Sequence, residues 1–388
     1  EDAVGRVILE YSYKDGWFDI TDGEGFSLTV IDPTADVTSW DIKDNWRASA
    51  AVDGSPGSDD SGLIPNPGDI VVNEVMSNPS SGQSDWIELH NTTSHTVNIG
   101  GWFISDSDAN EVYRKKYEIA TGTAIPAGGY LVFTADAHFD NISDPGCNIP
   151  FGLSDDGETV YVISGLNGQI TGYYEQEDFG PSAVDVSFGR YIKSDGDINF
   201  VAMSQPTPNL QNSYPKIGPV VISEIMYHPA GDSDAEYVEL RNVTNQAVAL
   251  KRFDGDTGGY LPWAFSDGID FEFPVETVIP ANGYIVVAKD PAVFTATYGA
   301  LPKSVELLGP FQNDTSLSNG GEKVEIGIPG HLDGGDRLYI RVDRVNYSDD
   351  APWPTSPDGD GPTLHKIVDS EYGNDHINWQ AQNPTPGF

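Results

Sequence analysis

The stretch "DWIELHN" (85–91) returns later in the chain as "EYVELRN" (236–242), and this repetition decides the fold. Both stretches alternate apolar and polar residues and contain β-branched or aromatic side chains, which is typical of β-strands. Each follows another recurring block, "IVVNEVMSNP" (70–79) in one place and "VVISEIMYHP" (220–229) in the other. A pair of strands that recurs in the same order predicts two domains of the same structure.

Further blocks follow in the same order in both copies. They are "WFISD" (102–106) and "WAFSD" (263–267), "IPAGGYLVF" (125–133) and "IPANGYIVV" (279–287), and "LSDDGETVYV" (153–162) and "LSNGGEKVEI" (317–326). The blocks are short and are bounded by Gly, Pro, Asn and Asp, the residues that form tight turns. We therefore predict an all-β protein of tandem antiparallel β-sandwiches.

The start of the chain repeats the end of the second copy. The shared residues are Tyr11 and Tyr347, Trp17 and Trp353, Gly25 and Gly361, and Leu28 and Leu364, followed by Asn-Trp at 45–46 and 378–379. Residues 1–64 are therefore predicted to be the C-terminal part of a truncated repeat, so that the chain begins inside a domain. The predicted domains are 1–64, 68–213 and 218–388.

A truncated repeat would leave apolar surface and unpaired strand edges. Three outcomes are open: the segment docks on the next domain, it is a remnant of a longer chain, or a neighbouring copy donates the missing strands by β-augmentation. Of these outcomes, we favour a fragment of a longer surface protein over an assembly of several copies.

These blocks resemble the lamin tail domain, an immunoglobulin-like β-sandwich. The first copy matches the family pattern at Asn73-Glu74, Asp85 to Leu89, Gly101-Trp102, Ser105-Asp106, Ile125-Pro126 to Val132, Ser187 to Arg190, and Thr207-Pro208-Asn209. The second copy has Ser223 in place of Asn73, Tyr237 in place of Trp86, and a Gly-rich insertion at 254–259. The chain has neither the heptad rod nor the C-terminal prenylation motif of nuclear lamins. The resemblance therefore implies the class of large secreted bacterial proteins with tandem tails.

The net charge of −40 comes from 60 acidic and 20 basic residues. Such a field repels phosphate backbones and anionic membranes, so we expect no nucleic-acid partner. No apolar run reaches the roughly 18 residues of a membrane span, so we expect no membrane insertion. Cys147 is the only cysteine, which leaves the redox compartment open.

The sequence gives little support for catalysis. The seven histidines are scattered, without the H-E-x-x-H or H-x-x-x-H spacing of metal sites. Glu74 with Glu88, and Glu224 with Glu239, recur in both copies on alternating strands, and one interpretation is a carboxylate pair for acid–base chemistry or for a metal. We favour the interpretation that these glutamates face solvent or bind backbone N–H groups. An enzyme would need titratable groups clustered in a pocket between domains.

Acidic turns are the best candidate site, because Asp-Gly-Asp turns supply several of the oxygens that Ca²⁺ needs. The candidate Ca²⁺ ligands are Asp106, Asp108, Asp195, Asp197, Asp254, Asp256, Asp358 and Asp360. The alternative is that they are solvated turn residues, and none of these turns completes an EF-hand loop.

The expected function is that of a non-catalytic structural, spacer or adhesion module, located outside the cell or on its surface. Its expected partners are other protein modules or copies of itself. The alternative is a carbohydrate-binding accessory module of a larger secreted enzyme, which would present Trp or Tyr in an exposed row. We expect instead that Trp86, Trp102, Trp263, Trp353 and Trp379 anchor the core.

Overall fold

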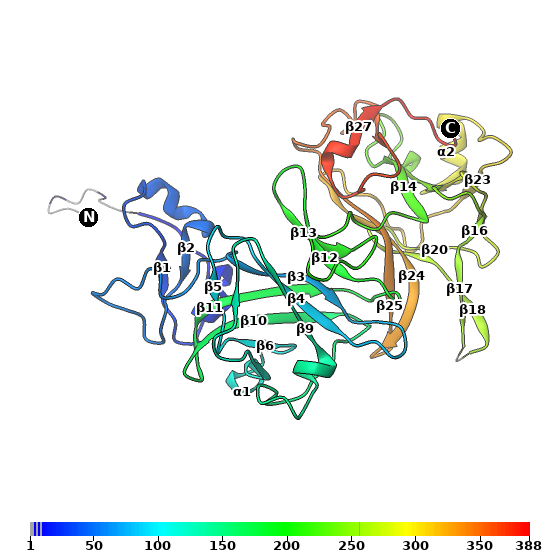
Figure 1. The fold of residues 1–388 in the computed structure, drawn as a ribbon. Helices are drawn as coiled ribbons and strands as arrows, with labels where there is room; N and C mark the ends of the chain where they lie inside the picture. The colour runs from blue at the N-terminus through cyan, green and yellow to red at the C-terminus, as the bar shows by residue number, and fades with distance from the viewer. Residues whose placement is uncertain (1–3, 5–6, 8–9, 256) are drawn as a thin grey trace. The chain divides into compact units, whose positions relative to one another are not determined.

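The computed structural model describes residues 4, 7, 10–255 and 257–388. The chain forms two compact units (Figure 1). The first comprises residues 1–179, 184–190 and 205–213, and the second comprises 180–183, 191–204 and 214–388. Strands dominate both units, which confirms the predicted all-β fold.

The first complete domain is built on two sheets, with strand orders β13-β12-β3-β4-β9 and β11-β10-β6-β7, of which the edge strand β13 belongs to residues 191–204 of the second unit. The strands of the five-stranded sheet are β3 (Ile70–Met76), β4 (Trp86–Asn91), β9 (Tyr130–Thr134), β12 (Phe188–Ile192) and β13 (Ile198–Ala202). Those of the four-stranded sheet are β6 (Phe103–Ser105), β7 (Tyr117–Glu118), β10 (Glu158–Leu166) and β11 (Gln169–Phe179). A further pair is β5 (Val97–Asn98) with β8 (Ala124–Ile125).

The second complete domain repeats this plan, with sheets β23-β22-β15-β14-β26-β27 and β20-β19-β24-β25. The larger sheet contains β14 (Val220–Met226), β15 (Tyr237–Asn242), β22 (Tyr284–Ala288), β23 (Glu306–Leu308), β26 (Thr363–Lys366) and β27 (Trp379–Gln382). The other contains β19 (Ala264–Asp267), β20 (Phe271–Glu272), β24 (Glu322–Asp333) and β25 (Asp336–Tyr347). Two small pairs are β16 (Val248–Ala249) with β21 (Val278–Ile279), and β17 (Lys251–Asp254) with β18 (Gly259–Pro262).

The core of the second domain lies between its two sheets. Ile222 and Leu240 from the larger sheet pack in one cluster with Phe265, Ile326 and Val345 from the other. Burying an aliphatic or aromatic side chain of this size contributes about 1.5–3 kcal/mol. Strand β14 is buried along its whole length, because β15 and β26 flank it and β25 covers one face.

Helices are short in the described part of the chain, and none has the length and apolar composition needed to cross a membrane. The longest is α2 (Pro291–Tyr298), which begins with Asp290 as N-cap and a proline in its first turn. Helix α1 (Glu111–Arg114) is a single turn capped by Asn110.

The N-terminal segment forms a hairpin of β1 (Leu28–Val30) and β2 (Trp46–Ala48) that packs on β11 inside the first unit. Its apolar cluster of Ile20, Phe26 and Ala48 contacts Ile170 and Tyr174 of β11. The segment therefore docks on the following domain, which was the first of the three outcomes open from the sequence.

Candidate functional site: buried carboxylates and an open strand edge

Each complete domain buries two glutamates opposite each other on adjacent strands. Glu74 of β3 pairs in register with Glu88 of β4, and Glu224 of β14 pairs with Glu239 of β15. All four side chains are at most 1% exposed. The expectation that they face solvent is wrong, because the turns at 207–209 and 385–387 lie against these side chains and donate hydrogen bonds to them.

In the first domain, donors from distant parts of the chain surround both carboxylates. Glu74 accepts hydrogen bonds from Ser187 Oγ at 2.5 Å, Thr207 N at 3.1 Å and Thr207 Oγ1 at 2.8 Å. Glu88 accepts from Asn73 Nδ2 at 2.8 Å and from the backbone N–H of Asn209. The alternative interpretation, that the glutamates bind backbone N–H groups, is therefore confirmed.

The second domain repeats the arrangement with different side chains. Glu224 accepts from Thr363 Oγ1 at 2.6 Å and from Thr385 N at 3.0 Å. Glu239 accepts from Ser223 Oγ at 2.6 Å and from Gly387 N at 2.5 Å. Ser223, which replaces Asn73 of the first copy, thus keeps the donor role of that position.

The backbone donors belong to one turn that recurs, Thr207-Pro208-Asn209 in the first domain and Thr385-Pro386-Gly387 in the second. Asn209 and Gly387 have φ values of 64° and 86°, and a residue with positive φ after proline is the signature of a type II turn. The turn closes with Leu210 N to Thr207 O at 3.0 Å and Phe388 N to Thr385 O at 3.1 Å. In each domain this turn binds the C-terminal end of the domain to the two glutamates.

Burial shifts the pKa values of Glu74, Glu88 and Glu239. It raises the pKa of Glu88 to about 7 and that of Glu239 to about 8, against the hydrogen bonds that favour the ionised form, and the neighbouring glutamate adds to the rise. Burial also raises the pKa of Glu74. Groups with such pKa values can exchange protons near neutral pH, but these are closed off from solvent and engaged by the chain's own donors. The arrangement can hold the C-terminal turn of each domain against the sheet that carries the two glutamates.

The raised pKa values predict that stability falls as pH rises from 5 to 8. The folded state holds protons on Glu88 and Glu239 that the unfolded chain, with glutamate pKa values near 4.5, has released, so the free energy of unfolding decreases with pH in this window. The slope is up to about 1.4 kcal/mol per pH unit and group. Urea midpoints at pH 5, 6.5 and 8 measure it.

Glu239→Gln is the control for that experiment. A glutamine there can accept from Gly387 N and donate to the Ser223 hydroxyl, so the variant should flatten the pH dependence of the second unit without losing the fold. General charge repulsion at −40 would persist in the variant. An unchanged slope in Glu239→Gln would contradict the role given to this carboxyl.

A second polar pair joins the sheets of each domain, and the sequence interpretation missed it. Lys366 Nζ lies 3.9 Å from Asp343 Oδ2, and Asp343 also accepts from Ile222 N at 2.8 Å beside the β-bulge. In the first domain, Arg190 lies 3.9 Å from Glu175. The recurrence of a base on β12 or β26 and an acid on β11 or β25 was the available signal.

The predicted Ca²⁺ ligands lie in turns, and the structure gives most of them partners inside the chain. Asp106 pairs with Lys116, and Asp108 accepts from Tyr174 Oη at 3.2 Å. Asp195 and Asp197 both accept from Lys193 Nζ, at 3.0 and 3.3 Å.

The other candidates are in the second domain. Asp254 accepts from Thr257 Oγ1 at 2.6 Å, and Asp358 lies 2.5 Å from His228 Nδ1. Asp360 is exposed, and Asp256 lies outside the described residues. Among the described residues, none of these aspartates belongs to a group of three or more side chains close enough to share a metal ion.

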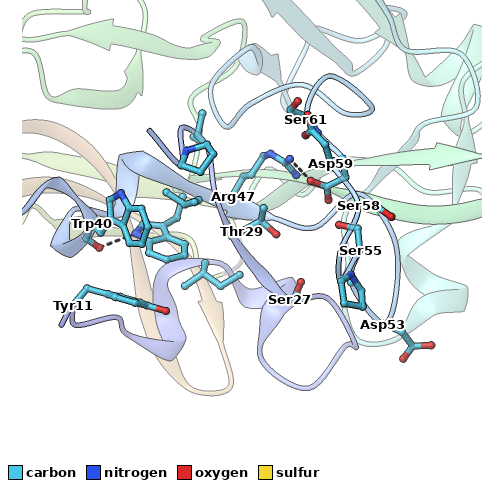
Figure 2. Close-up of a pocket in the computed structure, with 18 residues that line it drawn as sticks. Tyr11, Ser27, Thr29, Trp40, Arg47, Asp53, Ser55, Ser58, Asp59 and Ser61 are labelled. Atoms are coloured by element: carbon cyan, nitrogen blue, oxygen red, sulfur yellow. Dashed lines mark hydrogen bonds and ion pairs between the residues drawn. The ribbon is translucent and has the colours of Figure 1, made fainter. Parts of the chain in front are cut away.

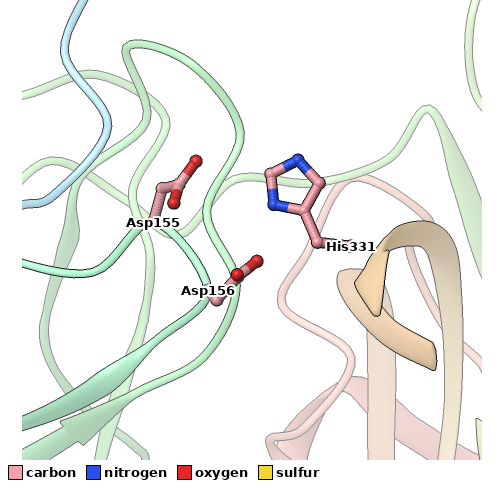
Figure 3. A group of neighbouring side chains, drawn as sticks. All are labelled: Asp155, Asp156 and His331. Atoms are coloured by element: carbon pink, nitrogen blue, oxygen red, sulfur yellow. The ribbon is translucent and has the colours of Figure 1, made fainter. Parts of the chain in front are cut away.

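Asp155 and Asp156 lie in the turn before β10 of the first unit, whereas His331 lies in β24 of the second unit (Figure 3). The first turn is tied down locally by Asp156 N, which donates to Ser154 Oγ at 3.2 Å. Because the residues belong to separate units, we build no site from them.

The tryptophans bear out the predicted core role where they are buried. Trp102, Trp263 and Trp379 are 4–5% exposed. Trp353 is partly buried and packs against the core of the second domain, and Trp86 is also partly buried.

A cavity of about 810 Å³ lies beside β1, between that strand and the loop 53–61 (Figure 2). Thr29 and Ser55 line it from the two sides. Arg47 Nη2 and Asp60 Oδ1 meet at 2.5 Å in its wall, and this bond lowers the pKa of Asp60 to about 2. Among the described residues, no strand other than β2 pairs with β1. The cavity therefore borders an open strand edge.

Comparison with known proteins agrees with this architecture. The family model described as Lamin Tail Domain matches residues 64–176 and 214–328, which together make up more than half of the chain. No curated protein and no solved structure matches the chain. The predicted resemblance to tandem immunoglobulin-like lamin tail domains is confirmed, and the family is one of typically non-catalytic modules. The chain belongs to the lamin tail domain family, with two of its domains in tandem.

Proposed function

We propose that the chain is a non-catalytic structural, spacer or adhesion module at the cell surface or outside the cell. The observation that carries this proposal is that the recurrent carboxylates are buried and bound by the chain's own tail turns, so they hold the sandwiches closed. The charge of −40 supports solubility outside the cell and argues against nucleic acid and membrane insertion as partners.

The partners that we propose are other protein modules or copies of the chain, met through the N-terminal hairpin. The open edge of β1 supports this, since an unpaired edge is a template for another strand. Labelling of intact source cells with an antibody to the chain tests the location. Signal without permeabilisation is expected, and signal only after permeabilisation would contradict the proposal.

A carbohydrate-binding accessory role is the second candidate, and one observation favours it. The inserted hairpin β17–β18 exposes Phe253 (56%) and Tyr260 (57%), packed edge to face at 5.5 Å beside a cavity of about 490 Å³. Aromatic faces next to a few polar groups are typical of ligand pockets.

A glycan array separates the two functions. The structural proposal expects no binding above background. Binding that is lost in Tyr260→Ala but kept in Tyr113→Ala, an exposed tyrosine of the first unit, would favour the carbohydrate role.

Ca²⁺ binding in the acidic turns stays a prediction. Its test is calorimetric titration of the full chain with CaCl₂. A site requires a saturable heat that Asp358→Asn or Asp195→Asn removes.

A further inference from the structure

The β1–β2 hairpin has the geometry of β26–β27, the hairpin that closes the second domain. The register is the same in both, with the pairs Leu28–Ala48 and Val30–Trp46 in one hairpin and Leu364–Ala381 and Lys366–Trp379 in the other. Trp46 Nε1 donates to the carbonyl six residues before it at 2.7 Å, and Trp379 Nε1 does the same. The partner tryptophan also matches, with ring centroids 6.4 Å apart for Trp17–Trp46 and 6.3 Å for Trp353–Trp379.

The turn that binds the glutamates also recurs after β2. Ser55-Pro56-Gly57 has Gly57 at φ 76°, and Ser58 N donates to Ser55 O at 3.0 Å, as in Thr385-Pro386-Gly387. In the second domain the N–H groups of Thr385 and Gly387 reach Glu224 and Glu239. The corresponding N–H groups of Ser55 and Gly57 have no carboxylate partner among the described residues.

The second domain shows what pairs with such a hairpin. Strand β26 carries β27 on one edge and β14 on the other, with Leu364 opposite Ile225 and His365 opposite Glu224. Leu28 and Thr29 occupy these positions in β1. Ser27 O accepts from Ser49 N and Ile31 N donates to Asn45 O, on either side of β2, so the alternation of an antiparallel strand turns the backbone groups of Leu28 and Val30 to the open edge.

The cavity of about 810 Å³ lies along this edge, and the Ser55–Gly57 turn borders it. Its Arg47–Asp60 pair is internally satisfied, because Asp60 also accepts from Ala50 N at 2.9 Å and from the Ser55 hydroxyl. The groups that remain available to bind another strand are the edge of β1 and the backbone N–H groups of the turn.

We propose that the β1 edge and the Ser55–Gly57 turn form a receptor site for two antiparallel strands of another polypeptide, each carrying a glutamate as β14 and β15 do. The incoming strand extends the β1–β2 sheet, and its glutamate accepts from Ser55 N, while the glutamate of the second strand accepts from Gly57 N. A folded second copy cannot supply these strands, because its four glutamates are buried and bound by its own tails. The inference rests on the assembly part of the proposed function and narrows it, since of the two kinds of partner proposed there it selects another protein over a copy of the chain.

The test uses a fluorescent peptide of residues 218–243, which holds both glutamate strands, added to the full chain. We expect saturable binding by anisotropy and slower hydrogen exchange at Leu28–Val30. A peptide carrying Glu224→Ala and Glu239→Ala should bind at least about tenfold more weakly, since it lacks both acceptors for the N–H groups of the turn, and each donor left unsatisfied on burial costs about 1–3 kcal/mol.

Leu28→Pro in the chain removes an N–H that faces the open edge, where proline is tolerated, and should abolish binding. Near-ultraviolet circular dichroism of the Trp17–Trp46 pair checks that the hairpin survives, and an N-methylated peptide gives the same block without altering the chain.

Three results would overturn the inference: no binding of the unmodified peptide, binding unaffected by either block, or concentration-dependent protection of Leu28–Val30 in the chain alone, which would assign the edge to a second copy. Failure of the peptide leaves the proposed location at the cell surface standing, because labelling of intact cells tests that location separately.

Discussion

Replacing Glu224 with alanine is expected to lower the free energy of unfolding of the second unit by about 3–5 kcal/mol, because the loss of two hydrogen bonds adds to the cost of a cavity at a fully buried side chain. The substitution leaves the part-buried Thr385 N–H without its acceptor and the buried Thr363 hydroxyl with only the Gln382 carbonyl at 3.3 Å, and it opens a cavity in β14. Since domains are stable by only about 5–15 kcal/mol, much of the stability would be lost.

Residues 385–388 should show the destabilisation by Glu224→Ala most directly. Thr385 is held to the sheet through Glu224, so hydrogen exchange at residues 385–388 should accelerate along with the fall in the urea midpoint. Glu306→Ala is the matched control, because Glu306 is an exposed glutamate on β23 of the same sheet, and it should change stability by less than about 0.5 kcal/mol. A loss below 1 kcal/mol in Glu224→Ala with an unchanged tail would refute the closing role of this carboxylate.

Gly172→Ala is expected to release the N-terminal segment from β11. A Cβ atom at this position would lie 1.8 Å from Ser49 O and 2.9 Å from Ser49 C. These are backbone atoms, so β2 must move as a whole, and overpacking of this kind costs about 1–3 kcal/mol or more. The contacts of Ile20 and Phe26 with β11, and the 2.7 Å ion pair between Arg114 and Glu24, should be lost together.

Limited proteolysis read by mass spectrometry measures this release. New cleavage between residues 10 and 64 is expected, whereas β10 and β11 should stay protected because they remain paired with each other. Gly180→Ala serves as the control, since a Cβ there meets no atom within 4 Å. Equal cleavage of Gly172→Ala and Gly180→Ala would show that the segment is not held through this contact.

The strands could be predicted from the sequence because their signals are local. "DWIELHN" and "EYVELRN" became β4 and β15, which both end at an asparagine, and "YLVFTA" became β9. Strand β11 escaped prediction, since its second half, "YEQEDF", is polar where it is partly exposed. The inserted stretch 254–259 was seen, but its form as the tip of a hairpin depends on the pairing of β17 with β18.

The acidic turns show the limit of composition. The spacing of Asp195 and Asp197 suggested metal ligands. In the structure, both carboxylates accept a hydrogen bond from the Lys193 ammonium group. Spacing along the chain cannot reveal which base lies nearest in space.

The sequence by itself determined that the chain contains two copies of one β-sandwich and a third copy of the hairpin that ends it. It could do so because strand patterning and turn chemistry act over a few residues. Only the tertiary structure decided the role of the glutamates. Thr207 lies 133 residues from Glu74 along the chain, and Thr385 lies 161 residues from Glu224. A buried glutamate side chain is stable where hydrogen-bond donors meet its carboxyl oxygens, and these donors come together only after the chain has folded.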